Sequence, residues 1–302
     1  MAQFKAIKKM ALSVPMAIAL FVSMGANPTL AGDPFRSKKN VRQIGDRTEV
    51  AFDKLFRLGN YKAAKQDLIR ATSLESEEPL AHALRAAIAY TEEDWEHIRI
   101  YAKKTISAAE TLKAQDRMRG HLYLGVGHFL DGAYQFEKKG AVAALTKLQQ
   151  VLYHFDRAEN LAPHDPELNL LKGYMELMLA VNLPFSSPEE AIARFQDRAA
   201  PNFLVTRGIA LAYRDLHQFD KALQFAETAL QQTPKNPELI YLKGQILRAK
   251  GIKENDLVLL QEALGYFDKA LTKSHQLPET ILEPIQREHR NTIQQLNRAR
   301  AN

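Results

Sequence analysis

Histidine has the widest chemical range of any residue type in this chain, because imidazole can bind metals or transfer protons near neutral pH. The nine histidines are scattered along the sequence. Only His121 and His128 share one face of an expected helix, no His-Glu-x-x-His motif occurs, and no histidines cluster with a carboxylate. We therefore expect no metal ion and no cofactor.

Paired acids are the second candidates for chemistry, and they occur at residues 77–78, 92–94 and 189–190. General acid–base catalysis would need two carboxylates that face one pocket. Each group instead lies at an expected turn or first helical turn, where acids cap the helix and suit its dipole. Gly125 and Gly127 lack the preceding strand and following lysine of a phosphate loop, and no Gly-x-Ser-x-Gly motif is present. The sequence thus predicts a protein that is not an enzyme.

The lack of cysteine and the mild charge exclude further classes. Without cysteine there is no disulfide, no thiolate metal site and no lipid-modified N-terminal cysteine. The formal net charge is +6, and residues 1–31 contribute three lysines and no acid, which leaves +3 (6 minus 3) for the rest. Proteins that bind nucleic acid usually have a strongly basic face. We expect no nucleic-acid partner.

The N-terminus has the pattern of a secretory signal peptide. Three lysines precede an apolar stretch at residues 11–24, and Thr29, Leu30 and Ala31 provide a cleavage site. An uncleaved membrane anchor is the alternative, but the apolar run is short for a bilayer span and Pro15 interrupts it. We expect an exported protein with no membrane span in its mature form. The periplasm is the first expectation, with the thylakoid lumen or the extracellular space as alternatives, and residues 32–44 would form a flexible linker.

Cleavage after Ala31 predicts that the exported protein begins at Gly32, which the intact mass of protein purified from the extracytoplasmic fraction would show. The Ala31→Tyr variant is expected to retain residues 1–31, because the peptidase accepts a small side chain at this position. A mass that includes residues 1–31 in the unsubstituted protein would favour the membrane anchor instead.

Two eight-residue stretches indicate an internal repeat. Residues 166–173 (PELNLLKG) and 237–244 (PELIYLKG) match at six of eight positions and start 71 residues apart (237 minus 166). This spacing is close to twice a period of about 34 residues, the length of one kind of helix-turn-helix repeat. Helix formers dominate the composition, which is 46% hydrophobic and 25% charged. The sequence therefore predicts an all-α protein.

Residues 202–236 supply the copy between the two stretches. Small, aromatic and helix-ending residues recur there at the spacing of a helical hairpin: Ala210, Tyr213, Phe219, Ala222, Ala226, Ala229 and Pro234. This segment resembles a tetratricopeptide repeat (TPR). The resemblance implies a right-handed superhelical solenoid of about six TPR-like helical hairpins plus a C-terminal capping helix.

The solenoid would occupy residues 45–302, with unequal hairpins. The third is longer than the fifth by 14 residues (33 minus 19), and two longer helices around Gly140 would keep the buried faces nearly in register. The fourth has about six extra residues near Pro184, which we expect to form a loop before a helix capped by Ser187. The expected hairpins lie at about 45–78, 79–112, 117–165, 166–201, 202–236 and 237–277, with a capping helix at 279–300.

Proteins of this kind bind a peptide on the concave side, which the first helix of each hairpin lines. Leu122, Val126 and Leu170 on this wall are better explained as core. The lysine and asparagine clamp that some family members use for a C-terminal carboxylate is not visible, because Arg207 and Leu211 stand there. The predicted binding residues are Tyr174, Leu177, Arg207, Leu211, Arg214, Tyr241, Gln245 and Arg248.

Together these observations predict an exported, non-enzymatic scaffold or assembly factor for a protein or peptide partner. An export signal followed by such repeats is similar to exported bacterial TPR proteins, cyanobacterial ones among them. One alternative is a cell-wall enzyme, or its regulatory subunit, with an acidic pair that only the fold brings together. Another is a binder of a small molecule or lipid in the elongated third hairpin.

Overall fold

The computed structural model describes residues 33–36, 41–182 and 188–301. The expected signal peptide at 1–31, most of the expected loop in the fourth hairpin, and Ser187 lie outside the described residues. The described part is all-helical and contains no strand. Its helices are α2 (Asp46–Phe56), α3 (Tyr61–Leu74), α4 (Pro79–Thr91), α5 (Trp95–Leu112), α6 (Arg117–Lys139), α7 (Ala141–Leu161), α8 (Pro166–Asn182), α9 (Pro188–Asp197), α10 (Asn202–Asp215), α11 (Phe219–Gln232), α12 (Pro237–Glu254), α13 (Leu257–Leu271) and α14 (Glu279–Ala301), with a short 3₁₀ helix η1 (Ser274–Gln276).

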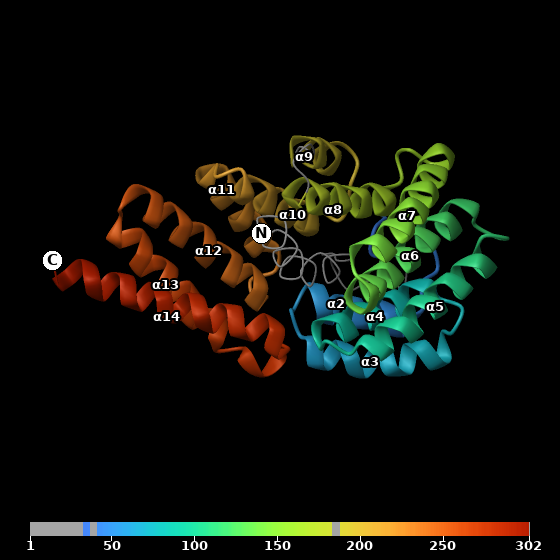
Figure 1. The fold of residues 1–302 in the computed structure, drawn as a ribbon, viewed down its shortest axis with the longest axis horizontal. Coiled ribbons are helices and arrows are strands. Elements are labelled where there is room, and N and C mark those ends of the chain that lie inside the picture. Colours follow the sequence, from blue (N-terminus) through green and yellow to red (C-terminus); the bar gives the residue numbers. More distant parts are fainter. Residues whose placement is uncertain (1–32, 37–40, 183–187, 302) are drawn as a thin grey trace.

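The helices pack in the order of the sequence. Each α-helix from α2 to α14 contacts the next one, and the contacts are most extensive within the pairs α4–α5, α6–α7, α10–α11 and α12–α13 and between α5 and α6. Figure 1 shows α2–α5, α6–α7, α8–α11 and α12–α14 following one another around the molecule. Sequential packing of this kind buries one continuous core that runs from the N-terminal helices to α12.

Helix starts follow from short polar side chains before the first helical residue. Asn60, Asp94, Asp116 and Asp256 each accept a hydrogen bond from a backbone N–H in the first turn of the next helix. Such caps satisfy N–H groups that have no partner within the helix. They help to fix the residue at which each of these helices begins.

The glycine that ends each copy of the repeated stretch allows two helices to approach closely. A Cβ on Gly173 would lie 2.6 Å from the Phe195 ring of α9, and one on Gly244 would lie 2.7 Å from the Phe267 ring of α13. No real Cβ tolerates such distances, so each glycine makes room for an aromatic ring of the partner helix. The repeated glycine is therefore a packing requirement.

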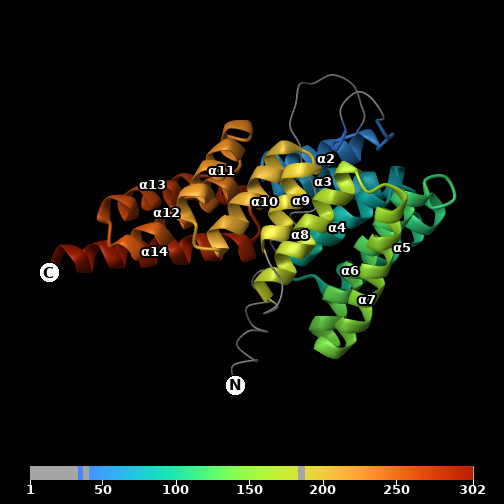
Figure 2. The same ribbon diagram turned by 90° about the horizontal axis from the view of Figure 1, so that it is seen from above.

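The third pair of helices is long, as the insertion of 14 residues predicts. Helix α6 ends at Lys139, Gly140 adopts a positive φ of 80°, and α7 begins at Ala141. The tip of this pair extends away from the rest of the molecule in Figure 2. Val142 and Leu145 are exposed near this tip.

Helices from the two ends of the described array are in direct contact. The Asn236 side chain at the start of α12 donates a hydrogen bond of 2.7 Å to the carbonyl of Phe56 at the end of α2, 180 residues earlier. The Thr280 hydroxyl of α14 donates to the carbonyl of Thr91 at the end of α4, and Figure 1 shows the start of α14 beside α3 and α4. This contact between the ends of the array is not a feature of the extended superhelix that the resemblance implies.

The expectation of a flexible linker at residues 32–44 needs correction for the described part. Phe35 is only 3% exposed, and its ring lies edge-on to Phe52 of α2 at a centroid distance of 5.5 Å. Asp33, Pro34 and Ile44 are buried as well. This segment packs against the helices because burial of the Phe35 ring is favourable and because Arg36 neutralises a buried charge, which is described below.

Replacement of Gly244 by alanine is expected to lower the free energy of unfolding by about 1–3 kcal/mol, because the new Cβ would overlap Phe267. Gly265 of α13 is the matched control, since a Cβ there has no atom within 4 Å. Gly265→Ala should raise the same free energy by up to about 1 kcal/mol. Urea unfolding of both variants measures this, and equal effects would contradict the packing role of Gly244.

Candidate functional site

Five of the eight predicted binding residues lie in the interior. The Tyr174 hydroxyl donates a hydrogen bond of 2.7 Å to the Leu204 carbonyl, and its side chain is 2% exposed. The Tyr241 hydroxyl donates to Oε1 of Glu288 in α14 at 2.8 Å. Arg207 is also buried, and so are Leu177 and Leu211. A ligand could reach these side chains only if the surrounding helices moved.

The other three predicted residues are half-buried and remain partly accessible. The Arg214 guanidinium donates to the amide oxygen of Gln245 at 3.1 Å. Arg248 donates to the hydroxyl of Thr292 at 3.0 Å and to Gln295 at 3.2 Å, both in α14. The helix expected to cap the array therefore packs against the predicted binding wall. A ligand role for these three residues stays a prediction.

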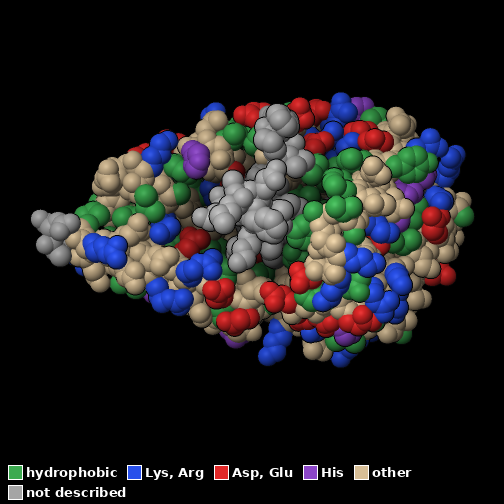
Figure 3. Space-filling view, viewed as in Figure 1, with side chains coloured by type: hydrophobic (Ala, Val, Ile, Leu, Met, Phe, Trp, Pro, Cys, Tyr) green, Lys and Arg blue, Asp and Glu red, His purple; other side chains and the backbone are tan. Residues whose placement is uncertain are grey.

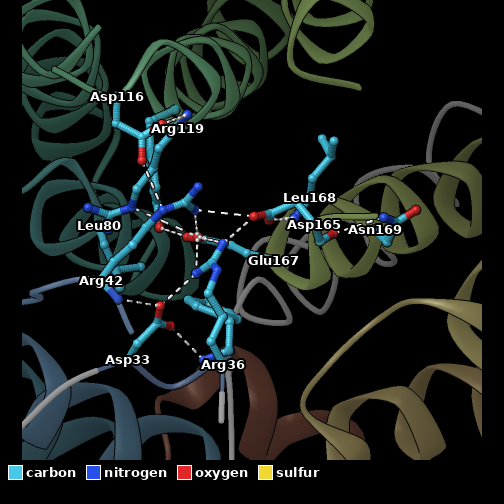
Figure 4. A network of polar contacts seen from close by, with 12 residues as sticks. Asp33, Arg36, Arg42, Leu80, Asp116, Arg119, Asp165, Glu167, Leu168 and Asn169 are labelled. Atoms are coloured by element: carbon cyan, nitrogen blue, oxygen red, sulfur yellow. Dashed lines mark hydrogen bonds and ion pairs between the residues drawn. The ribbon is translucent and has the colours of Figure 1, made fainter. Parts of the chain in front are cut away.

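A polar network at the start of α8 brings together distant parts of the chain around Glu167 (Figure 4). Glu167 follows Pro166, the first residue of α8, and is 0% exposed. Its Oε1 accepts a hydrogen bond of 2.6 Å from the hydroxyl of Tyr123 in α6. A buried carboxylate needs compensating charge, because transfer of an unpaired ion out of water is costly.

Two of the compensating charges come from the segment before α2, residues 33–44. The Arg36 guanidinium donates to Oε2 of Glu167 at 3.3 Å and to Oδ2 of Asp165 at 2.5 Å. Its Nη1 also bonds to Oδ2 of Asp33 at 2.7 Å. Arg42 contacts Glu167 at 3.4 Å and makes an ion pair of 2.9 Å with Asp116. Figure 4 shows these guanidinium groups converging on the same carboxylates.

Arg119 of α6 also belongs to the network, but its hydrogen bonds are made to Glu78 and not to Glu167. It forms two hydrogen bonds with the carboxylate of Glu78, at 2.7 and 3.2 Å. Its Nε lies 3.8 Å from Oε2 of Glu167 and is buried without a hydrogen-bond partner. Burial raises the pKa of Glu167, but the charges of Arg119, Arg36 and Arg42 and the bond from Tyr123 outweigh it and leave this pKa below its ordinary value. Glu167 is therefore ionised at neutral pH.

The second copy of the repeated stretch places Glu238 in a similar setting. Arg207 of α10, 1% exposed, donates to Oε2 of Glu238 at 2.9 Å, and the hydroxyl of Tyr61 in α3 lies 3.1 Å from Oε1. Burial and the nearby Glu238 carboxylate raise the pKa of Tyr61 well above its ordinary value, so its hydroxyl stays protonated and donates. Both buried acids thus pair with arginine and tyrosine side chains.

The sequence does not reveal this network, although it carries one signal of it. Glutamate occupies the second position of both repeated stretches, directly after the proline that starts each expected helix. An acid at a buried position implies a cation nearby. The pattern does not reveal that Arg36 supplies it, because Arg36 and Glu167 are 131 residues apart.

Three histidines meet between α6 and α7. Nδ1 of His121 lies 3.0 Å from Nδ1 of His154, and the ring of His128 stacks on His154 at a centroid distance of 5.4 Å. His154 could not be placed with the other two from the sequence, since it lies on the second helix. Within the described ranges, no three His, Cys, Asp or Glu side chains are arranged to hold a metal ion.

A cavity of about 290 Å³ opens between α3, α4 and α5. The third pair of helices, where a binder of a small molecule or lipid was one alternative, does not line it. Ser76 and His82 lie at its wall, and Nε2 of His82 is 2.8 Å from the carbonyl oxygen of Ser76. The other lining residues are Thr72, Glu77, Lys104, Ser107, Ala108 and Thr111.

Comparisons with known proteins do not place the chain in a family. No protein-family model matches it, and no curated protein matches it either. Among the described helices, none has the length and apolar character to cross a bilayer. On the face shown in Figure 3, basic and acidic side chains of the described residues are intermixed along the rim.

The histidine cluster predicts a loss of stability in acid. The pKa of His154 is lowered from 6.5 to about 4. Burial is the largest cause, followed by the neighbouring His128 and His121. Below pH 6.5 the unfolded chain binds a proton that the folded chain does not bind, so stability falls between about pH 6.5 and 4. Because His154 is partly exposed, we expect this group to contribute only about 1–2 kcal/mol.

Urea unfolding at pH 7 and pH 4.5 measures this effect. His154→Asn should reduce the difference in stability between the two pH values. His275→Asn is the control, because His275 is exposed in η1 and should leave the difference unchanged. Equal pH dependence in His154→Asn and the unsubstituted protein would contradict the prediction.

Proposed function

We propose that the protein is an exported, non-enzymatic scaffold that binds polypeptide partners through an array of TPR-like helical hairpins. One observation carries the proposal: the helices pair in sequence order, and their interior holds the side chains of Phe35 and Arg36 from a short segment outside the pairs. Repeat arrays of this architecture commonly present extended surfaces to other chains. Export rests on the signal-peptide pattern at residues 1–31.

The cell-wall enzyme has less support from the geometry. Asp165 and Glu167 do share the Arg36 guanidinium, so two carboxylates lie close together. A general acid needs a raised pKa, whereas the pKa of Glu167 is lowered by its arginine neighbours. Paired in this way, the carboxylates are suited to hold a cationic group in place.

The partly accessible residues of α10 and α12 provide the test for partner binding. Arg214→Ala with Arg248→Ala removes two guanidinium groups that are half-buried and bonded to polar neighbours. Arginine side chains at interfaces often contribute 1–2 kcal/mol each, so recovery of a partner should fall about tenfold or more. The measurement is quantitative pull-down from an extracytoplasmic extract.

The matched control removes two exposed arginines of α14, Arg290 and Arg298. We expect this double variant to recover the same partners as the unsubstituted protein, because these residues extend into solvent. If the two double variants recover identical partner sets in equal amounts, Arg214 and Arg248 do not contact a partner.

A further inference from the structure

The arginines that donate hydrogen bonds to the two buried glutamates lie in different parts of the chain. Glu238 is paired by Arg207 at 2.9 Å and by Tyr61, and both lie within the helical pairs. Glu167 has Tyr123 within the pairs, but its other hydrogen-bond donors are Arg36 and Arg42, which precede the first pair. The helical array thus gives Glu238 a hydrogen-bonded arginine. At Glu167 it supplies only Arg119, at 3.8 Å, and the arginine hydrogen bonds come from Arg36 and Arg42.

The difference follows from one position of the repeat. Arg207 lies three residues before Ala210, the residue that we expect at the close contact between the helices of its pair. The equivalent position in α6, three residues before Gly125, is Leu122. Leu122 is fully buried and brings no charge. Arg119, one turn earlier, is bonded to Glu78 and is too far from Glu167 for a hydrogen bond.

Without the added segment, the helical array has an excess of negative charge at this point. Within the network, the helical array contributes the carboxylates of Glu78, Asp116, Asp165 and Glu167 and the guanidinium of Arg119, a formal charge of −3 (1 minus 4). The segment contributes Arg36, Arg42 and Asp33, a sum of +1 (2 minus 1). A guanidinium is the group that fits this surplus best, because its planar fork bonds to two carboxylates at once.

Residues 33–36 are held against the helical array by contacts of their side chains. The described backbone of residues 33–36 makes one hydrogen bond, from the N–H of Phe35 to the Asp33 carboxylate in the same segment. Phe35 is held by its contact with Phe52 and Arg36 by its ion pairs. Phe35 and Arg36 therefore carry the central contacts, and Arg42 adds ion pairs with Asp116 and Glu167.

We propose that the acidic site formed by Asp165, Glu167 and Asp116, with the adjacent surface of Phe52, is a binding site for an aromatic–arginine motif of a partner polypeptide. Phe35 and Arg36 occupy this site as a tethered competitor, so a partner binds by displacing them. This inference rests on the proposed function as a polypeptide-binding scaffold and specifies the chemistry that the scaffold recognises. The tether lowers the apparent affinity for partners, as any competing intramolecular ligand does.

The first experiment measures binding of a fluorescent synthetic peptide with the sequence of residues 33–44. The variant with Phe35, Arg36 and Arg42 all changed to alanine should bind this peptide about tenfold or more tightly than the intact protein. With both arginines changed to glutamine, the peptide should bind the triple variant about tenfold or more weakly. Adding Glu167→Gln to the triple variant should weaken its binding of the native peptide by a similar factor. Fluorescence anisotropy gives these affinities.

The matched control is Ile69→Ala with Arg70→Ala, an adjacent apolar–arginine pair that is exposed on α3. It should bind the peptide as weakly as the intact protein. Circular dichroism shows whether each variant is folded. A folded triple variant that binds the peptide no better than the intact protein would overturn the inference.

A second measurement applies even if the triple variant does not fold. The chain has no cysteine, so Pro34→Cys introduces a single thiol next to Phe35, at a buried position. Excess peptide should speed its reaction with a thiol reagent by about tenfold, because displacement exposes the segment. The peptide without arginines should have no effect. An unchanged rate with the native peptide overturns tethered competition. The pull-down with the Arg214→Ala, Arg248→Ala variant tests the proposed function separately.

Discussion

A carboxylate buried in the first turn of a helix has to be neutralised, and this requirement organises the interior of the molecule. Glu167 and Glu238 occupy this position in α8 and α12, directly after the proline that starts each helix. The positive end of the helix dipole helps, but it acts weakly compared with the cost of burial. Arginine and tyrosine side chains from other parts of the chain must therefore reach each site. The chain brings Arg207 and Tyr61 to one and Arg36, Arg42 and Tyr123 to the other.

The features that the sequence predicts are those set by neighbouring residues. The all-α class follows from helical periodicity, and the boundaries at Gly140 and Pro237 follow from backbone geometry at those residues. Asp165 and Asn236 cap the helices that follow them, as short polar side chains before a helix commonly do. The long α6 and α7 follow from a count of residues between close-contact positions. Each of these inferences uses a stretch of at most a few turns.

The features that the sequence does not reveal depend on partners far along the chain. The residue type and helix position of Arg207 do not show whether it binds a ligand or a buried acid. Only the fold brings the Glu238 carboxylate to 2.9 Å from its guanidinium. Tyr174 and Tyr241 are ambiguous in the same way, because a tyrosine that anchors a ligand also suits a buried hydrogen bond. Phe35 and Arg36 fall within the expected linker, because no local pattern connects them with α2 or α8.

The contact between the first helices and α12 changes how the array should fold and unfold. In an open stack of repeats, each unit touches only its neighbours, so stability is a sum of local terms and either end can fray alone. The bond from Asn236 to Phe56 joins residues 180 positions apart and adds a term that exists only when both ends are formed. Contacts of such long sequence separation slow folding, because a large loop must close before they form. The same loop closure makes unfolding more cooperative, since neither terminal pair of helices can detach without loss of the contact that joins them.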